Sequence, residues 1–167
     1  MTINHFRRSG TLIISCLLCL ILTACGFHLK ETTELPSAFQ KVSVQGISIE
    51  RNFGRVLRDA FTDARSDLQA NTDHPTKLTI SKLEEGRRVA AYNFDRTVRQ
   101  YLLFMTFEYT LEANGKKLGT FPVNIDSTLN YDSDFVLGEQ EEERLIREEL
   151  RRDAARLILL RFKSVAQ

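Results

Sequence analysis

Apolar and polar residues alternate in some segments of the chain and recur at helical spacing in others, and these two patterns predict its elements. Residues 41–50, KVSVQGISIE, alternate and predict a first strand, in which Gly46 shifts the alternation as a β-bulge would. Residues 51–70 place apolar side chains on one helical face and arginine and aspartate on the other, which predicts an amphipathic helix. Pro75 follows this helix and cannot continue it.

The rest of the chain predicts three more strands and a closing helix. Residues 76–83, TKLTISKL, predict a second strand, and the polar stretch after it is interpreted as a strand end and turn. The longest alternating segment, residues 98–111, has apolar side chains on both faces near its start. Asn114-Gly115 predicts a tight hairpin into a returning strand, residues 119–136. The closing helix is expected over about residues 138–164, with glutamates at its start and arginines in its second half, as the helix dipole favours.

The predicted order, β-α-β-β-β-α, indicates an α+β domain. We expect two helices packed on one face of a four-stranded mixed sheet, with parallel or mixed pairing around the first helix and antiparallel pairing after it. The other sheet face is then left open. Because residues 98–111 are apolar on both sides near their start, we expect something outside the domain to cover part of that face.

The first 24 residues have the pattern of a secretory signal peptide. Arg7 and Arg8 precede an apolar run of roughly a dozen residues, which is shorter than the about 20 residues that a membrane-spanning helix needs. An uncleaved anchor helix is the alternative interpretation. The run ends at residues 22–25, Leu-Thr-Ala-Cys, which resemble the lipobox of bacterial lipoproteins, where the cysteine sulfur receives a diacylglycerol. Cys25 is therefore the predicted lipidation site and the first residue of the mature protein.

The residue after the predicted lipidation site bears on location. An aspartate there resembles an inner-membrane retention signal, whereas this chain has Gly26, so we expect an anchor on the periplasmic side of the outer membrane. Several acyl chains on one residue give stable anchoring. Residues 25–40 lack any period and are expected to form a lipidated tether, and residues 41–167 are expected to form a single α+β domain.

Composition and charge exclude several function classes. The formal net charge of +1 provides no basic field for nucleic acid. Cys16 and Cys19 leave with the signal peptide, so no disulfide is expected in the mature chain. His28 and His74 have no cysteine or spaced carboxylate pair near them, and no nucleophile or phosphate-loop motif occurs. We therefore expect no metal, no cofactor other than a covalent lipid, and no enzymatic activity.

One polar group, within residues 87–101, RRVAAYNFDRTVRQY, suggests a binding site. Arginine binds phosphate through paired hydrogen bonds, and aromatic side chains offer surface to acyl chains or sugars. The alternative interpretation is a solvated sheet end whose arginine stems cover apolar surface. The candidate ligand-binding residues are Arg87, Arg88, Arg96 and Arg99, with Tyr92, Phe94 and Tyr101 between them.

Two stretches and the charge pattern of the closing helix resemble one protein family. ACGFHLK at residues 24–30, RTVRQYLLFMTFEYTL at residues 96–111 and the acidic-to-basic helix are similar to the LptE family, the lipoprotein subunit of the outer-membrane lipopolysaccharide translocon. The resemblance implies two helices on a four-stranded sheet and no catalytic activity. It also implies a plug inside the large β-barrel protein LptD, assistance in that barrel's assembly, and binding of lipopolysaccharide.

The resemblance further implies basic residues in contact with lipopolysaccharide. Arg96 or Arg99 matches one of them, whereas Glu139 stands where the family has a second. An alternative function is a periplasm-facing lipoprotein that tethers or chaperones a soluble envelope partner without entering a barrel. The partner that is recovered with the protein distinguishes the two.

Overall fold

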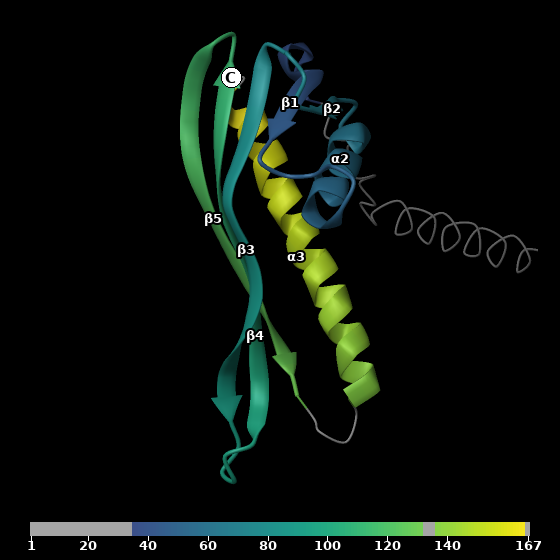
Figure 1. Cartoon of the computed structure of the whole chain (residues 1–167), viewed down its shortest axis with the longest axis vertical. Helices are drawn as coiled ribbons and strands as arrows, with labels where there is room; N and C mark the ends of the chain where they lie inside the picture. Colours follow the sequence, from purple (N-terminus) through teal and green to yellow (C-terminus); the bar gives the residue numbers. More distant parts are fainter. Residues whose placement is uncertain (1–34, 132–135, 166–167) are drawn as a thin grey trace, which may run out of the picture. The chain divides into compact units, whose positions relative to one another are not determined.

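The computed structural model describes residues 35–131 and 136–165, so the expected signal peptide and Cys25 lie outside the described residues. All described residues belong to one compact unit, Thr33–Gln167. The elements (Figure 1) are η1 Ser37–Phe39, β1 Lys41–Gln45, α2 Asn52–Asp63, β2 Asp67–Ala70, β3 Thr76–Tyr92, β4 Val98–Ala113, β5 Lys116–Asn130 and α3 Val136–Val165.

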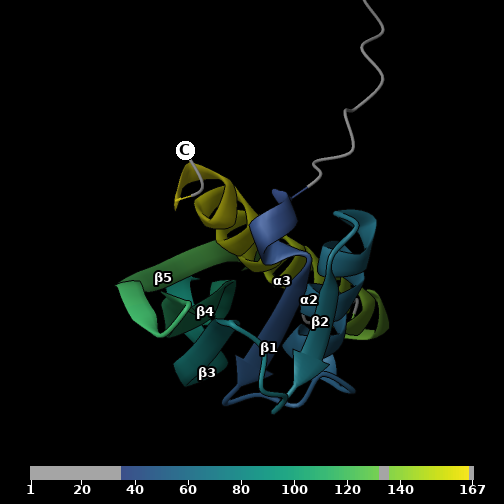
Figure 2. The ribbon, with the colours of Figure 1, turned by 90° about the horizontal axis from the view of Figure 1, so that it is seen from above.

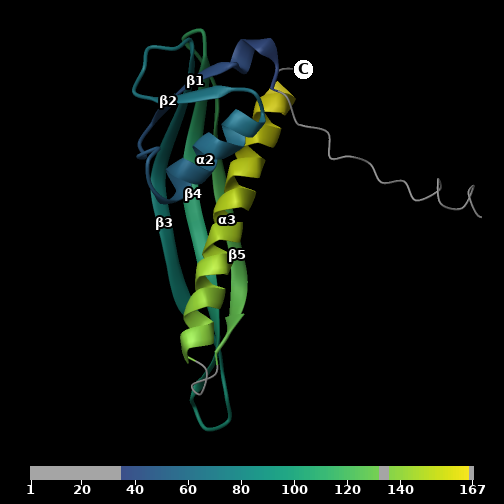
Figure 3. The same cartoon turned by 90° about the vertical axis from the view of Figure 1, so that its right-hand side faces the viewer.

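The strands form one mixed sheet in the order β2-β1-β3-β4-β5. β1 pairs in parallel with β2 and β3, whereas β3–β4 and β4–β5 are antiparallel. α2 and α3 lie side by side on one face of this sheet (Figure 3). The predicted α+β class, the mixed sheet and the two helices are confirmed. The predicted number of strands is wrong, because the sheet has five strands and the order is β-α-β-β-β-β-α.

The unexpected strand, β2, occupies the end of the segment predicted as one helix over residues 51–70. α2 ends early because Arg65 adopts the left-handed conformation, with φ 55°. The backbone N–H of Ser66 donates to the carbonyl of Phe61 at 2.9 Å. The N–H of Arg65 donates to the carbonyl of Thr62 at 3.0 Å. Together these bonds form the Schellman ending of a helix, after which the chain turns into β2.

β3 is longer than predicted, because the polar stretch expected as a strand end and turn continues the strand. This stretch pairs with β4, where Glu85 lies opposite Met105 and Arg87 opposite Leu103. A β-bulge between Ser81 and Glu84 shifts the register part-way along the pair. The pairing with β4 is a tertiary interaction that outweighs the weak strand preference of the polar residues themselves.

β1 is shorter than predicted, because Gly46 ends the strand instead of forming a bulge inside it. Gly46 has φ +87°, which residues with a side chain rarely adopt. A Cβ atom on this residue would lie 1.9 Å from the carbonyl oxygen of Ile80. The close approach of the two backbones therefore requires glycine here.

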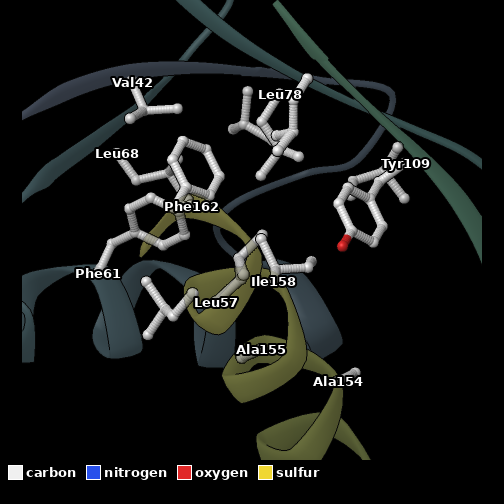
Figure 4. Close-up of a cluster of buried hydrophobic side chains, with 14 of the residues drawn as sticks. Val42, Leu57, Phe61, Leu68, Leu78, Tyr109, Ala154, Ala155, Ile158 and Phe162 are labelled. Atoms are coloured by element: carbon white, nitrogen blue, oxygen red, sulfur yellow. The ribbon is translucent and has the colours of Figure 1, made fainter. Parts of the chain in front are cut away.

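The core lies between the two helices and the sheet (Figure 4). Phe162 of α3 contacts Phe39 and Phe61 edge-on, with ring centroids 5.2 and 5.3 Å apart. Seen along the long axis, η1 lies beside the C-terminal part of α3, where the contact with Phe39 forms (Figure 2). Leu35 and Phe39 fall in the segment expected as a tether, yet both are buried in this core. Ordered packing thus begins before residue 41.

Replacing Phe162, which is 1% exposed, by alanine is expected to lower the free energy of unfolding by about 3–5 kcal/mol, because it leaves a cavity between the two helices. Phe94→Ala is the matched control, since the same atoms are removed from a fully exposed side chain and the expected change is within about 0.5 kcal/mol. Urea unfolding followed by circular dichroism measures both. Equal losses in the two variants would contradict this description of the core.

Candidate functional site

The candidate arginines lie along the long hairpin of β3 and β4, which extends past the N-terminal end of α3 (Figures 1 and 3). Tyr92 and Val98 form the last pair of the hairpin, and residues 93–97 make its turn. We call residues 92–99 the tip. A tip held on two long paired strands is presented at a defined position at one end of the described domain.

Side-chain hydrogen bonds fix the conformation of the turn. The Asp95 carboxylate accepts hydrogen bonds from the Thr97 hydroxyl at 2.7 Å and from the Thr97 backbone N–H at 3.0 Å. These two bonds lower the pKa of Asp95, because they favour the charged carboxylate. The Asn93 side-chain amide donates to the same hydroxyl at 2.9 Å, and the Asn93 N–H donates to the Thr97 carbonyl at 2.8 Å.

Two residues of the turn depart from local preference. Phe94 is fully exposed to solvent, with a relative exposure of 111%. Arg96 adopts the left-handed conformation, with φ 68°, a position that hairpin turns of this length usually give to glycine. The turn therefore carries an exposed ring and an exposed cation, and its own closure requires neither side chain.

Arg87 lies on the helix-covered side of the sheet and is engaged within the fold. Its guanidinium lies 4.6 Å from the Tyr101 ring centroid. It also donates to Glu143 of α3 at 3.0 Å and lies 3.7 Å from Glu139. Glu139, noted as a departure from the family pattern, thus helps to neutralise one of the candidate arginines. On the same side, Glu85 pairs with Arg151 at 2.6 Å.

Arg88 lies on the opposite, open side of the sheet. It is paired with Leu102 across the hairpin, and its guanidinium lies 5.8 Å from the Phe104 ring centroid. The Phe104 ring covers Gly86, since a Cβ atom on that glycine would lie 2.6 Å from the phenylalanine Cζ. This stack gives the open face a cation beside an apolar surface.

The four candidate arginines therefore do not form one cluster. Arg96 lies in the turn, and alternation along β4 places Arg99 on the same side as Tyr101. Arg99 is three residues from Leu102, the partner of Arg88, which is about 10 Å along the strand. Within residues 35–131 and 136–165, the side chains of Arg96 and Arg99 make no ion pair or hydrogen bond and are exposed. Of the four candidate arginines, these two are the most available to a ligand.

A second surface feature was missed by the sequence analysis. A groove of about 470 Å³ lies between β5 and the C-terminal part of α3. Arg161 stacks on Phe121 at 3.9 Å from its ring centroid, and Leu157 and Leu160 line the groove although they are 42% and 48% exposed. The spacing of these α3 residues, three and four apart, marks a stripe that does not face the sheet core.

Among residues 35–131 and 136–165, no group of three or more histidine, cysteine, aspartate or glutamate side chains is arranged to hold a metal ion. None of the helices in these ranges combines the length and apolar character needed to span a bilayer.

Comparison with known proteins identifies the family. Residues 39–162 match the family model LptE, described as lipopolysaccharide-assembly. The chain belongs to this family. Its members are non-catalytic lipopolysaccharide-assembly lipoproteins with no known cofactor, so the expected family is confirmed, as is the prediction that the chain is not an enzyme.

Individual relatives agree in sequence and in fold. The LPS-assembly lipoprotein LptE of Pectobacterium atrosepticum is 23% identical over 162 residues, which cover 95% of this chain and 87% of that protein. The solution structure of lipoprotein B from Nitrosomonas europaea has a TM-score of 0.69 at 18% identity, covering 84% of this chain and 92% of that one. Rare lipoprotein B from Shewanella oneidensis has a TM-score of 0.65 at 19% identity, with 75% and 96% covered. These two structures share the fold.

The ion pairs between β3 and α3 predict a pH-dependent stability. Burial acts to raise the pKa of Glu143, but hydrogen bonds and charge from Arg147 and Arg87 outweigh it, so the pKa lies below its usual value of 4.5. Because the pKa of Glu143 is lower in the folded protein than in the unfolded chain, its ion pairs stabilise the fold fully above pH 4.5. This stabilisation is lost as the pH falls through the pKa of the folded state. Glu143→Gln should therefore reduce the free energy of unfolding by about 1 kcal/mol at pH 7.

The difference between Glu143→Gln and the unsubstituted chain should shrink as the pH falls below 4.5, because the glutamate loses its charge. Glu142→Gln, on the exposed side of the same helix turn, is the control and should have little effect. Urea unfolding at pH 7 and at acid pH measures both variants. A Glu143→Gln loss that is the same at both pH values would contradict the ion-pair explanation.

Proposed function

We propose that the chain is a non-catalytic outer-membrane lipoprotein that plugs the lipopolysaccharide translocon barrel, helps it to assemble, and binds lipopolysaccharide for insertion at the cell surface. The observation that carries this proposal is the projecting tip, where exposed arginines adjoin exposed aromatic side chains in a member of the LptE family. The barrel partner is a protein of the LptD type, and neither nucleic acid nor a metal takes part.

The open sheet face supports a position inside a barrel. On β4, Leu102 and Phe104 are half-buried on this face with no element of the described chain packed over them. A barrel that encloses the domain covers such side chains and meets the polar ones with a polar lumen. The open-face residues of β5 are all exposed and, apart from Pro122, polar: Thr120, Asn124, Asp126, Thr128 and Asn130.

The distribution of charge supports the tip as the site that binds lipopolysaccharide phosphates. Arg87 is already paired with two glutamates of α3, which leaves Arg96 and Arg99 at the tip and Arg88 on the open face. Phosphate oxygens accept two parallel hydrogen bonds from one guanidinium, which gives both affinity and orientation. Arg87 is therefore assigned a supporting role, in which it holds α3 against the hairpin.

The anchor completes the proposed function. A lipid on Cys25 holds the protein at the outer membrane once residues 1–24 are removed, and the segment before Leu35 connects that anchor to the domain. Anchoring by several acyl chains is stable, so the protein stays at the membrane where the barrel assembles.

The test of the proposed function is recovery of the tagged full-length chain from detergent-solubilised membranes, with identification of what accompanies it by mass spectrometry. We expect one large outer-membrane barrel protein in near-equal amount. Recovery alone, or with soluble envelope proteins, while Cys25 is lipidated, would contradict the plug and favour the tether or chaperone.

Lipopolysaccharide binding is tested by Arg96→Glu combined with Arg99→Glu. Because a charged hydrogen bond contributes about 1.5–3 kcal/mol, we expect the affinity for purified lipopolysaccharide to fall by roughly tenfold or more. The melting temperature should not change, because both side chains are exposed. Arg152→Glu with Arg156→Glu makes the same charge change on the exposed side of α3 and should leave binding intact. Equal binding by both double variants would refute the assignment of the tip.

A further inference from the structure

Phe94 is an apolar side chain that the fold exposes without using. Its relative exposure is 111%, the highest among the exposed large hydrophobic residues that the structure describes, and it lies at the end of the longest hairpin of the sheet. A large ring kept in water at a projecting position contributes nothing to the core. An exposed apolar group of this kind indicates a contact with something outside the chain.

The turn does not need Phe94 in order to close. Its hydrogen bonds join Asn93, Asp95 and Thr97 to one another, and Arg96 adds a bond from its N–H to the Asn93 carbonyl at 3.1 Å. None of these bonds involves the side chain at position 94. Loops of this kind favour small polar residues, so a phenylalanine here acts against the local preference.

Arg96, two residues further on, also departs from the local preference, because its left-handed backbone conformation favours glycine. Consecutive Cα atoms are 3.8 Å apart, so the Cα atoms of Phe94 and Arg96 are at most about 7 Å apart. The turn therefore attaches a ring and a cation to backbone positions a short distance apart. Both departures fall in one turn, which suggests a shared purpose.

We propose that Phe94 binds the acyl chains of the same lipopolysaccharide molecule whose phosphates the tip arginines bind. The inference rests on the proposed function, because it assigns a second part of that ligand to the same tip. In lipopolysaccharide, phosphates and acyl chains are attached to the same sugar units, so the two chemical groups occur at close spacing. The tip has the complementary arrangement, with Tyr92, which is 63% exposed, as a further aromatic surface.

The size of the effect favours one lipid molecule over a bilayer as the occupant. Burial of one phenylalanine changes an affinity by roughly ten- to hundredfold, depending on how completely the ring is covered. That is too little to hold a protein on a membrane, since even a whole myristoyl chain gives only marginal binding. It is enough to distinguish an acylated ligand from a deacylated one when the arginines already supply the charge contacts.

The test compares two probes on the full-length chain in one mild detergent: rough-type lipopolysaccharide, and the same material deacylated with alkali, which keeps its sugars and phosphates. We expect the unsubstituted protein to bind the acylated probe about tenfold more tightly. Phe94→Ser should lose that advantage, so that it binds both probes with the affinity that the unsubstituted protein has for the deacylated probe. Phe94→Leu, which restores an apolar side chain, should recover most of it. The melting temperatures should be equal.

The outcomes separate this inference from the proposed function. If neither probe binds to the unsubstituted protein, the proposed function fails. If both bind and Phe94→Ser changes neither affinity, or lowers both equally, the acyl assignment is overturned while the function stands. Arg96→Glu with Arg99→Glu should weaken both probes alike, which distinguishes charge from acyl recognition.

Two further measurements test other occupants of the tip. Phe94-dependent flotation of the protein with phosphatidylglycerol vesicles that contain no lipopolysaccharide would overturn the inference in favour of a bilayer contact. Loss of the co-purified barrel protein from Phe94→Ser would overturn it in favour of a protein contact. Unchanged flotation and unchanged co-purification support it.

Discussion

The packing of α3 along the sheet determines where the functional surfaces lie. Phe162 joins the helix to η1 and α2 through Phe39 and Phe61, and this aromatic contact anchors its C-terminal part. From there a helix of 30 residues extends about 45 Å toward the tip. Along this length the apolar contacts between the helix and the sheet decrease to a small cluster at Leu150. Ion pairs, such as that of Arg151 with Glu85, also join the helix to the sheet there. The hairpin is thus supported along its length while its open side and its tip stay uncovered.

The same helix decides which arginines are available to a ligand. Adjacent strand residues point to opposite faces, so Arg87 meets the glutamates of α3 and Arg88 does not. An arginine between two carboxylates has little affinity left for a phosphate, because the ligand must displace partners already in place. Of the four candidate arginines, those without a carboxylate partner among the described residues therefore lie at the tip and on the open face. The acidic start of α3 produces this distribution, because Glu139 and Glu143 neutralise Arg87.

The sequence predicted the fold class because its long segments are strongly periodic, as residues 98–111 are. β2 was missed because Leu68 continues the helical spacing of α2, whereas the helix ending at Arg65 depends on a left-handed backbone that composition does not reveal. The candidate arginines were found as a group, but their division between two faces was not. Their stretch was expected as a strand end and turn, whereas β3 continues through it and places adjacent residues on opposite faces. Which of them is paired depends on glutamates more than fifty residues away along the chain.

The turn at the tip departs most clearly from what stability alone would select. A turn built only to close the hairpin would have glycine at position 96 and a small polar residue at position 94. Arg96 in the left-handed conformation costs roughly 1–2 kcal/mol, and exposed Phe94 recovers none of it. Glycine would relieve the strain but would carry no side chain for a ligand. Holding arginine in that conformation, inside a turn fixed by Asp95 and Thr97, gives its side chain a defined starting direction. Recognition of a ligand by this side chain, as proposed, would account for the local cost, since the closure of the turn does not require arginine at this position.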